Sequence, residues 1–212
     1  VAIASLDTSV RKWSVKEFEG LTRHQLTDVS GPVELVDGEI LPLLISEPIE
    51  RQITLLTRQM GRHLIKQGLD GFEVRSHHTI HIDDYSVLRP AISLIERNHT
   101  DVVLHWVLDI FELPKNSDKR VSLYACCQVQ EYWNLCIDPV ELRVKTALDD
   151  TAYQQQQLLM VGEKVYPQRL PQFRLTLKEP LPLYFLTRTA QGQRTYVGTG
   201  VPLQLAGLMQ DD

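Results

Sequence analysis

Residues 102–110, VVLHWVLDI, and residues 118–139, DKRVSLYACCQVQEYWNLCIDP, decide the predicted fold. The first stretch is almost continuously apolar, which is typical of a central β-strand that is covered on both faces. The second stretch predicts a helix followed by a strand around YWNLCID. A buried strand, a helix and a further strand in this order favour one mixed sheet with flanking helices.

Three further elements are predicted on the N-terminal side of these stretches. Ser14 and Glu17 have the spacing of a capping box, and the apolar residues that follow recur at helical spacing. Asp37-Gly38 separates two apolar runs, which is the strongest short-range signal for a β-hairpin. Apolar residues recur every three or four positions between Pro48 and Gly68, and this pattern predicts the longest helix of the chain.

The remaining signals predict strands. Two β-rich runs, residues 72–82 and 87–95, are joined by DDYS, which predicts a second hairpin. Further short strands are expected in residues 140–177. Gln191-Gly192 has the character of a hairpin turn in a tail that shows no clear core pattern. The sequence therefore predicts an α/β (α+β) fold, with a mixed central sheet flanked by helices and with extra β-hairpins.

The predicted domain organisation is simple. Residues 1–11 are expected to form an N-terminal arm, residues 12–180 one domain, and residues 181–212 an appended C-terminal hairpin or arm. A chain of 212 residues is long enough to bury the core of one large domain or of two small ones. The sequence shows no internal repeat.

Composition narrows the class of protein. The chain has 43% hydrophobic and 23% charged residues, as expected of a globular protein, and a formal net charge of −5. This negative charge disfavours a broad nucleic-acid-binding surface, although a local basic groove remains possible. No apolar run approaches the roughly 20 residues of a membrane span, so we expect a cytoplasmic protein.

The order of these signals resembles the bacterial putative restriction endonuclease family, which has the PD-(D/E)XK nuclease fold and is abundant in cyanobacteria. The resemblance covers residues 12–178. Its most specific segments are ELVDGE at residues 34–39 and YACCQVQEYW at residues 124–133. It implies a restriction-endonuclease-like core and a homodimer.

The same resemblance implies a Mg²⁺ site that this sequence lacks. In that fold, acidic groups on adjacent strands hold Mg²⁺, while a lysine assists the nucleophile or stabilises developing charge. The family's Pro-Asp corresponds here to Pro90-Ala91, and its glutamate falls at His105 or Trp106. Strand alternation favours His105. The family's lysine corresponds to Arg120, which keeps the charge but cannot act as a base.

Three hypotheses about function follow. The leading one is a catalytically degenerate nuclease-fold protein, not an enzyme, that needs no cofactor and binds a protein or a larger assembly through residues 181–212. The first alternative is an active Mg²⁺-dependent DNA endonuclease with a rearranged site of Glu34, Asp109 and Arg120, in which Glu34 is the retained metal ligand. The second alternative is a DNA-binding protein that does not cleave.

A histidine cluster is the other candidate metal site. His77, His78 and His81 lie in one predicted strand. There, His77 and His81 would share a face about 13 Å apart, at about 3.3 Å per residue, and His78 would face the opposite way. One zinc ion cannot bridge that distance, so a zinc site would need ligands from a neighbouring strand.

Three arginines share a broad face of the longest predicted helix. Arg51, Arg58 and Arg62 follow each other at seven- and four-residue steps. Such a stripe is typical of a solvated helix face. The alternative is a site for phosphate or for the carboxylates of a partner.

Overall fold

The computed structural model describes residues 11–24, 31–43, 45–97, 102–111, 118–137 and 140–177, and the backbone of strands at 182–188, 194–200 and 206–208. The chain divides into two compact units. The first comprises residues 1–44 and 79–89, and the second comprises residues 45–78 and 90–212.

The first unit combines one helix with a small antiparallel sheet. Its sheet has the strand order β2-β1-β5-β4. Phe18 of the helix packs with Val33, Leu35 and Val87 of the sheet to form a small apolar core. The elements are α1 (Val15–Arg23), β1 (Val33–Val36), β2 (Glu39–Pro42), β4 (Ile80–Asp83) and β5 (Ser86–Leu88).

Both local signals predicted for this unit are confirmed. The Ser14 hydroxyl oxygen accepts a hydrogen bond from the Glu17 amide at 3.4 Å, and the Glu17 carboxylate accepts one from the Ser14 amide at 3.0 Å, which completes the capping box. Asp37 and Gly38 form the hairpin turn with φ values of 51° and 80°. These positive values at both central residues explain why the turn contains an Asp-Gly pair.

The second unit is built on a six-stranded mixed sheet with the order β10-β9-β8-β7-β6-β3. β7 and β8 pair in parallel, and the other neighbours pair antiparallel. Parallel neighbours need a crossover connection, which α3 (Asp118–Cys126) provides. The strands are β3 (Phe72–Ser76), β6 (Ile92–Arg97), β7 (Val102–Phe111), β8 (Glu131–Ile137), β9 (Val140–Asp149) and β10 (Ala152–Met160).

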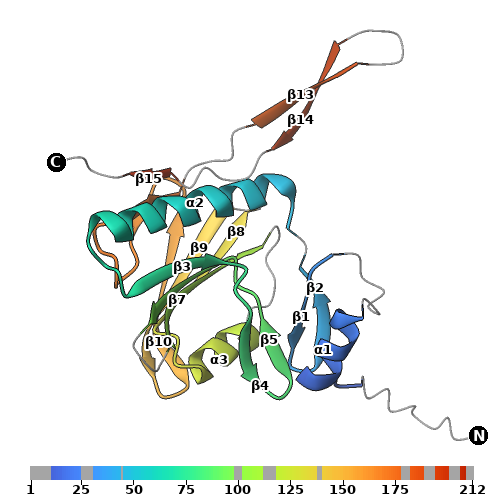
Figure 1. Ribbon diagram of the computed structural model, residues 1–212. Helices are drawn as coiled ribbons and strands as arrows, with labels where there is room; N and C mark the ends of the chain where they lie inside the picture. The colour runs from blue at the N-terminus through green and yellow to red at the C-terminus, as the bar shows by residue number, and fades with distance from the viewer. Residues whose placement is uncertain are drawn as a thin grey trace, which may run out of the picture. The chain divides into compact units, whose positions relative to one another are not determined.

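Helices lie on both faces of this sheet (Figure 1). α2 (Glu47–Lys66) buries its apolar stripe, which includes Ile53 and Met60, against a core that includes Trp106 and Leu108. α3 packs on the opposite face, where the Tyr124 ring lies 5.2 Å from the Tyr132 ring. The predicted long helix and the predicted central strand, β7, are therefore confirmed.

Two smaller sheets follow in the chain. β11 (Lys164–Val165), β12 (Arg174–Thr176) and β15 (Ala206–Leu208) form a three-stranded sheet. β13 (Pro182–Arg188) and β14 (Arg194–Gly200) form an antiparallel pair, as the sequence predicts for the tail. The predicted turn residues Gln191 and Gly192 lie outside the described residues, and the predicted domain boundaries stay predictions.

One prediction of strand continuity is wrong. Each of the two β-rich runs, residues 72–82 and 87–95, contains two strands that belong to different sheets. His77 has a φ of 49°, so the chain turns after β3. The predicted hairpin turn between the runs is confirmed, because β4 pairs with β5. The α+β class with a mixed central sheet is also confirmed. Among the described helices, none is long and apolar enough to cross a membrane.

Candidate functional site

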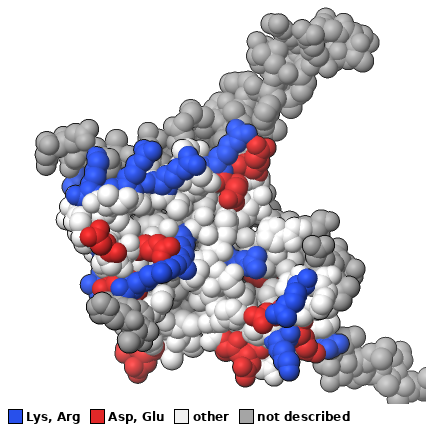
Figure 2. Space-filling model, in the orientation of Figure 1, with Lys and Arg blue, Asp and Glu red and all other residues white. Residues whose placement is uncertain are grey.

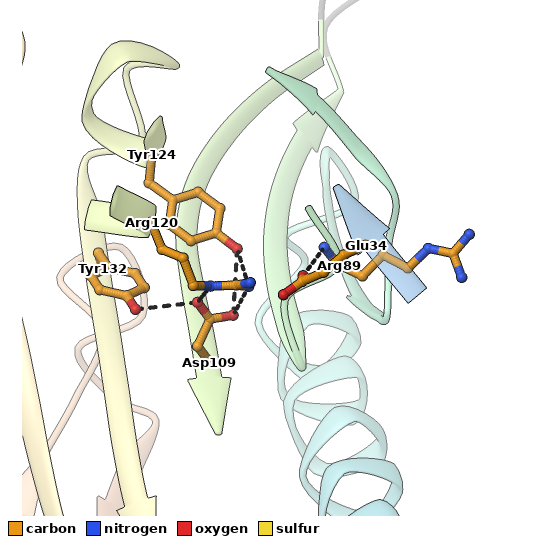
Figure 3. Close-up of polar contacts among 6 residues, drawn as sticks. All are labelled: Glu34, Arg89, Asp109, Arg120, Tyr124 and Tyr132. Atoms are coloured by element: carbon orange, nitrogen blue, oxygen red, sulfur yellow. Dashed lines mark hydrogen bonds and ion pairs between the residues drawn. The ribbon is translucent and has the colours of Figure 1, made fainter. Parts of the chain in front are cut away.

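A buried ion pair joins the centre of the sheet to α3. The Arg120 guanidinium donates from Nε to Asp109 Oδ2 at 2.8 Å and from Nη2 to Asp109 Oδ1 at 2.9 Å (Figure 3). Asp109 is 2% exposed and Arg120 is 7% exposed. This two-point geometry is the strongest form of an arginine–carboxylate contact.

Two tyrosine hydroxyls complete the surroundings of the carboxylate. Tyr132 donates to Asp109 Oδ2 at 3.2 Å, and Tyr124 donates to Oδ1 at 3.4 Å (Figure 3). Burial and the nearby Asp109 charge raise the pKa of Tyr132 well above its usual value, so its proton stays in place to be donated. Each oxygen of Asp109 therefore accepts one hydrogen bond from arginine and one from tyrosine.

The regular spacing of side chains in helices and strands explains how Asp109, Arg120, Tyr124 and Tyr132 come together. Arg120 and Tyr124 are four residues apart on α3, so they lie on one face of the helix. Tyr132 is in register with Val107 in the parallel β7–β8 pair. Because side chains alternate along a strand, Val107, Asp109 and Tyr132 point to the same side of the sheet, toward α3.

The positions where the resemblance implies further metal ligands carry no carboxylate. Ala91 is 4% exposed and has only a methyl side chain. Ala91 lies just before β6 and belongs to the apolar core that includes Ile92 and Leu108.

His105 and Trp106 are engaged in contacts of their own. His105 Nε2 lies 2.6 Å from Glu96 Oε2, and the His105 side chain is 4% exposed. The register of β6 and β7 shifts beside His105, because Leu94 pairs with Trp106 while Ile95 pairs with Leu104. Trp106 is fully buried and packs edge-on against Trp133, with ring centroids 5.1 Å apart.

Glu34, the retained acidic position, lies on β1 in the first unit. It is 6% exposed, and its Oε2 accepts a hydrogen bond from the Arg89 amide at 3.4 Å (Figure 3). Of the three residues that the sequence proposes for a rearranged catalytic site, the structure joins Asp109 and Arg120 within the second unit.

The residues of the second unit do not fit the Mg²⁺ ion that the resemblance implies. Mg²⁺ needs carboxylate oxygens in near-octahedral geometry. The Asp109 oxygens are bound by Arg120 and the tyrosines, and Ala91 offers no ligand atom. In the described parts of the chain, no group of three or more His, Cys, Asp or Glu side chains could hold a metal ion.

The histidine cluster is dispersed, because the predicted single strand is broken at His77. His77 Nε2 lies 2.8 Å from Glu50 Oε2 within the second unit. His81 belongs to β4 of the first unit, where its Nε2 lies 3.8 Å from Glu19 Oε1. Burial, and then the Arg75 charge, lower the pKa of His78.

The arginine stripe on α2 is solvent-exposed. Arg51, Arg58, Arg62 and Lys66 are all exposed. At about 100° per residue they span roughly 80° of the helix surface. Figure 2 shows basic side chains gathered along this helix. Arg51 forms an ion pair with Glu47 one turn earlier.

Three polar residues of the second unit are not among the predicted site residues. Tyr124 and Tyr132 are predicted only as parts of the family-like segment YACCQVQEYW, although the four-residue step from Arg120 to Tyr124 is a usable signal. Glu131 is the third residue. It starts β8 and is 3% exposed, which is unusual for a glutamate.

No family model matches the chain, and no curated protein matches it significantly. Among solved structures, the chain is similar to a putative nuclease belonging to DUF820 from Anabaena variabilis ATCC 29413. The TM-score is 0.46 and the sequence identity is 12%, over 68% of this chain and 86% of that chain.

Proposed function

We propose that this chain is a nuclease-like module that does not cleave DNA and that acts by binding a protein or a larger assembly. The observation that supports the proposal is the saturation of Asp109. Its carboxylate, which could serve as a metal ligand on β7, is bound through both oxygens by Arg120, Tyr124 and Tyr132.

A metal ion could reach Asp109 only by displacing the Arg120 guanidinium or a tyrosine hydroxyl. Displacing the guanidinium leaves Arg120, which is 7% exposed, without its counter-charge in a dry environment. Removing one partner of a buried ion pair typically costs about 3–5 kcal/mol. Ala91 provides no second carboxylate to offset this cost. The free-energy cost of breaking the Asp109–Arg120 ion pair therefore favours the ion pair over a metal site.

Plasmid cleavage tests this proposal. The purified chain is incubated with supercoiled plasmid and Mg²⁺ or Mn²⁺, beside the Glu34→Ala and Asp109→Asn variants. We expect the unaltered chain to convert no more plasmid than the variants do. Cleavage that either substitution abolishes would instead establish the active endonuclease with Glu34, Asp109 and Arg120.

The docking segment proposed for the partner is residues 181–212. Affinity purification from the native cell, with the full chain and with a chain ending at residue 180, tests this assignment. We expect one set of proteins to be retained by the full chain and lost by the shortened chain. If the full chain and the shortened chain retain the same proteins, the docking surface lies outside residues 181–212.

A second candidate function, DNA binding without cleavage, is favoured by the basic stripe on α2. Arg58, Arg62 and Lys66 are exposed on one side of the helix. Phosphate contacts of this kind make binding fall steeply with salt. The Arg58→Glu/Arg62→Glu double variant should abolish binding to duplex DNA at low salt. Absence of binding by the unaltered chain at low salt would exclude this candidate.

A further inference from the structure

The second unit contains an open polar groove at the end of the sheet where β8, β9 and β10 lie side by side. Its volume is about 760 Å³. One wall comes from the sheet and includes Glu131, Thr146 and Gln155. The segment after β10 contributes Lys164, Tyr166 and Gln168. The groove lies apart from the Asp109–Arg120 pair, which is on the α3 side of the sheet.

Strand register places three polar side chains in a row along the sheet wall. Thr146 pairs with Gln155 in the β9–β10 ladder. Tyr132 pairs with Lys145 in the β8–β9 ladder, so continuing that register by one residue places Glu131 beside Thr146. Directly opposed residues have Cβ atoms about 4.5–5.5 Å apart. A carboxylate, a hydroxyl and an amide thus line the groove at successive strands.

Glu131 is a buried carboxylate that forms no ion pair among the described residues, and the one cation of the groove lining is Lys164. Its Oε1 accepts from the Trp133 indole Nε1 at 2.7 Å, and its Oε2 accepts from the Gln168 amide at 2.8 Å. Both donors are neutral. Burial raises the pKa of Glu131 above its usual value, and the two hydrogen bonds offset only part of this rise. Buried charges are normally paired with an opposite charge, because desolvation of an isolated ion is costly.

The two hydrogen bonds also fix the position of the carboxylate. Each oxygen keeps further lone-pair capacity after accepting one bond. Trp133 is 1% exposed and Gln168 lies in the groove lining, so both ends of the carboxylate are held by the surrounding structure. A rigid acceptor that faces a polar groove is suited to a ligand that carries both positive charge and N–H donors.

We infer that this groove binds a cationic nitrogen group, such as the guanidinium of an arginine side chain or of a small guanidine compound, with Glu131 as its counter-ion. The amides of Gln155 and Gln168 and the hydroxyls of Thr146 and Tyr166 provide neutral polar partners for the rest of the ligand. This site is independent of the proposed function, because it involves neither Asp109 nor the α2 stripe.

Nuclear magnetic resonance of the full chain tests the inference directly. The Trp133 indole N–H donates to Glu131, so its resonance reports on that carboxylate. The chain has three tryptophans, and Trp13→Phe and Trp106→Phe variants assign the indole signals. The probe is agmatine, which carries a guanidinium and a primary ammonium on a four-carbon chain, and the neutral control with the same number of chain carbons is N-butylurea. We expect agmatine alone to shift the Trp133 signal in a saturable way.

Two variants decide whether the charge of Glu131 is responsible. Glu131→Gln removes the charge and keeps the shape, and it should abolish the agmatine response. Thr146→Arg supplies a guanidinium next to Glu131, so it should raise the thermal midpoint and remove agmatine binding, whereas Thr146→Met should not raise the midpoint.

The inference is overturned if agmatine gives no saturable shift, if N-butylurea gives the same shift, or if Glu131→Gln retains the response. If Glu131→Gln does not fold, the thermal midpoint of Thr146→Arg, compared with that of Thr146→Met, tests the inference instead. A lower thermal midpoint for Thr146→Arg than for Thr146→Met would show that the carboxylate needs no cation. Plasmid cleavage is measured separately, so failure here leaves the proposed function untouched.

Discussion

Removing one charge of the Asp109–Arg120 pair should destabilise the protein strongly. Asp109→Asn keeps the shape of the side chain but leaves a guanidinium that is 7% exposed without its counter-charge. The pair has two charge-assisted hydrogen bonds, at 2.8 and 2.9 Å. Such a loss costs about 3–5 kcal/mol of the free energy of unfolding, and Arg120→Met should cost a similar amount for the reciprocal reason.

The double variant Asp109→Asn/Arg120→Met should lose less than the sum of the two single variants. Both charges are then absent, so neither is buried alone. We expect a coupling free energy of roughly 1.5–3 kcal/mol from the double-mutant cycle. The assay is urea unfolding followed by tryptophan fluorescence. Trp106 and Trp133 are both buried in the second unit, so their emission reports on its unfolding.

A matched control uses the same substitution at an exposed pair. Arg51→Met removes the ion pair with Glu47 on the surface of α2. Exposed pairs four residues apart contribute only about 0.3–0.5 kcal/mol, so this variant should unfold almost as the unaltered chain does. If Asp109→Asn and Arg120→Met cost no more than Arg51→Met, or if their costs add, the description of a tightly coupled buried pair is wrong.

Three further predictions concern other parts of the molecule. Burial, and then the Lys66 charge, lower the pKa of His63 below its usual value of 6.5. The unfolded chain therefore binds a proton at His63 more readily than the folded chain does, and the free energy of unfolding should fall as the pH drops below 6.5. In the His63→Leu variant, urea unfolding at pH 7 and at pH 5 should show a smaller fall. Ser14→Ala removes the cap of α1 and should cost about 1 kcal/mol, with faster hydrogen exchange of the α1 amides. At Gly38, with φ of +80°, an added Cβ would lie 2.7 Å from Lys12 Cβ, so Gly38→Ala should lower the thermal midpoint in calorimetry, with a cost of about 1–3 kcal/mol.

Local signals predicted much of the fold because they depend on near neighbours in the sequence. Each of these signals depends on residues only a few positions apart in the sequence. They are the capping box at Ser14, the turn at Asp37-Gly38 and the apolar period of α2. The division of residues 72–82 between two sheets was missed, because a polar break at His77 looks the same as the solvent face of one continuous strand. That distinction depends on which distant strand supplies the hydrogen bonds.

The candidate site was predictable in part. Position-by-position comparison with the resembled family identified Ala91 and Arg120, and it proposed Asp109 as a residue of a rearranged site. It did not pair Asp109 with Arg120. That contact depends on α3 packing across the sheet, which brings together residues 11 positions apart along the chain. Glu131 was also missed, since burial of a glutamate at the start of a strand leaves no mark in the local pattern.

Crystals of the chain soaked in Mn²⁺ and measured for anomalous scattering test the central claim most directly. We expect the Arg120 guanidinium to remain on the Asp109 carboxylate, with no anomalous peak at coordination distance from either carboxylate oxygen. A peak about 2.1 Å from an Asp109 oxygen, with Arg120 displaced, would contradict it.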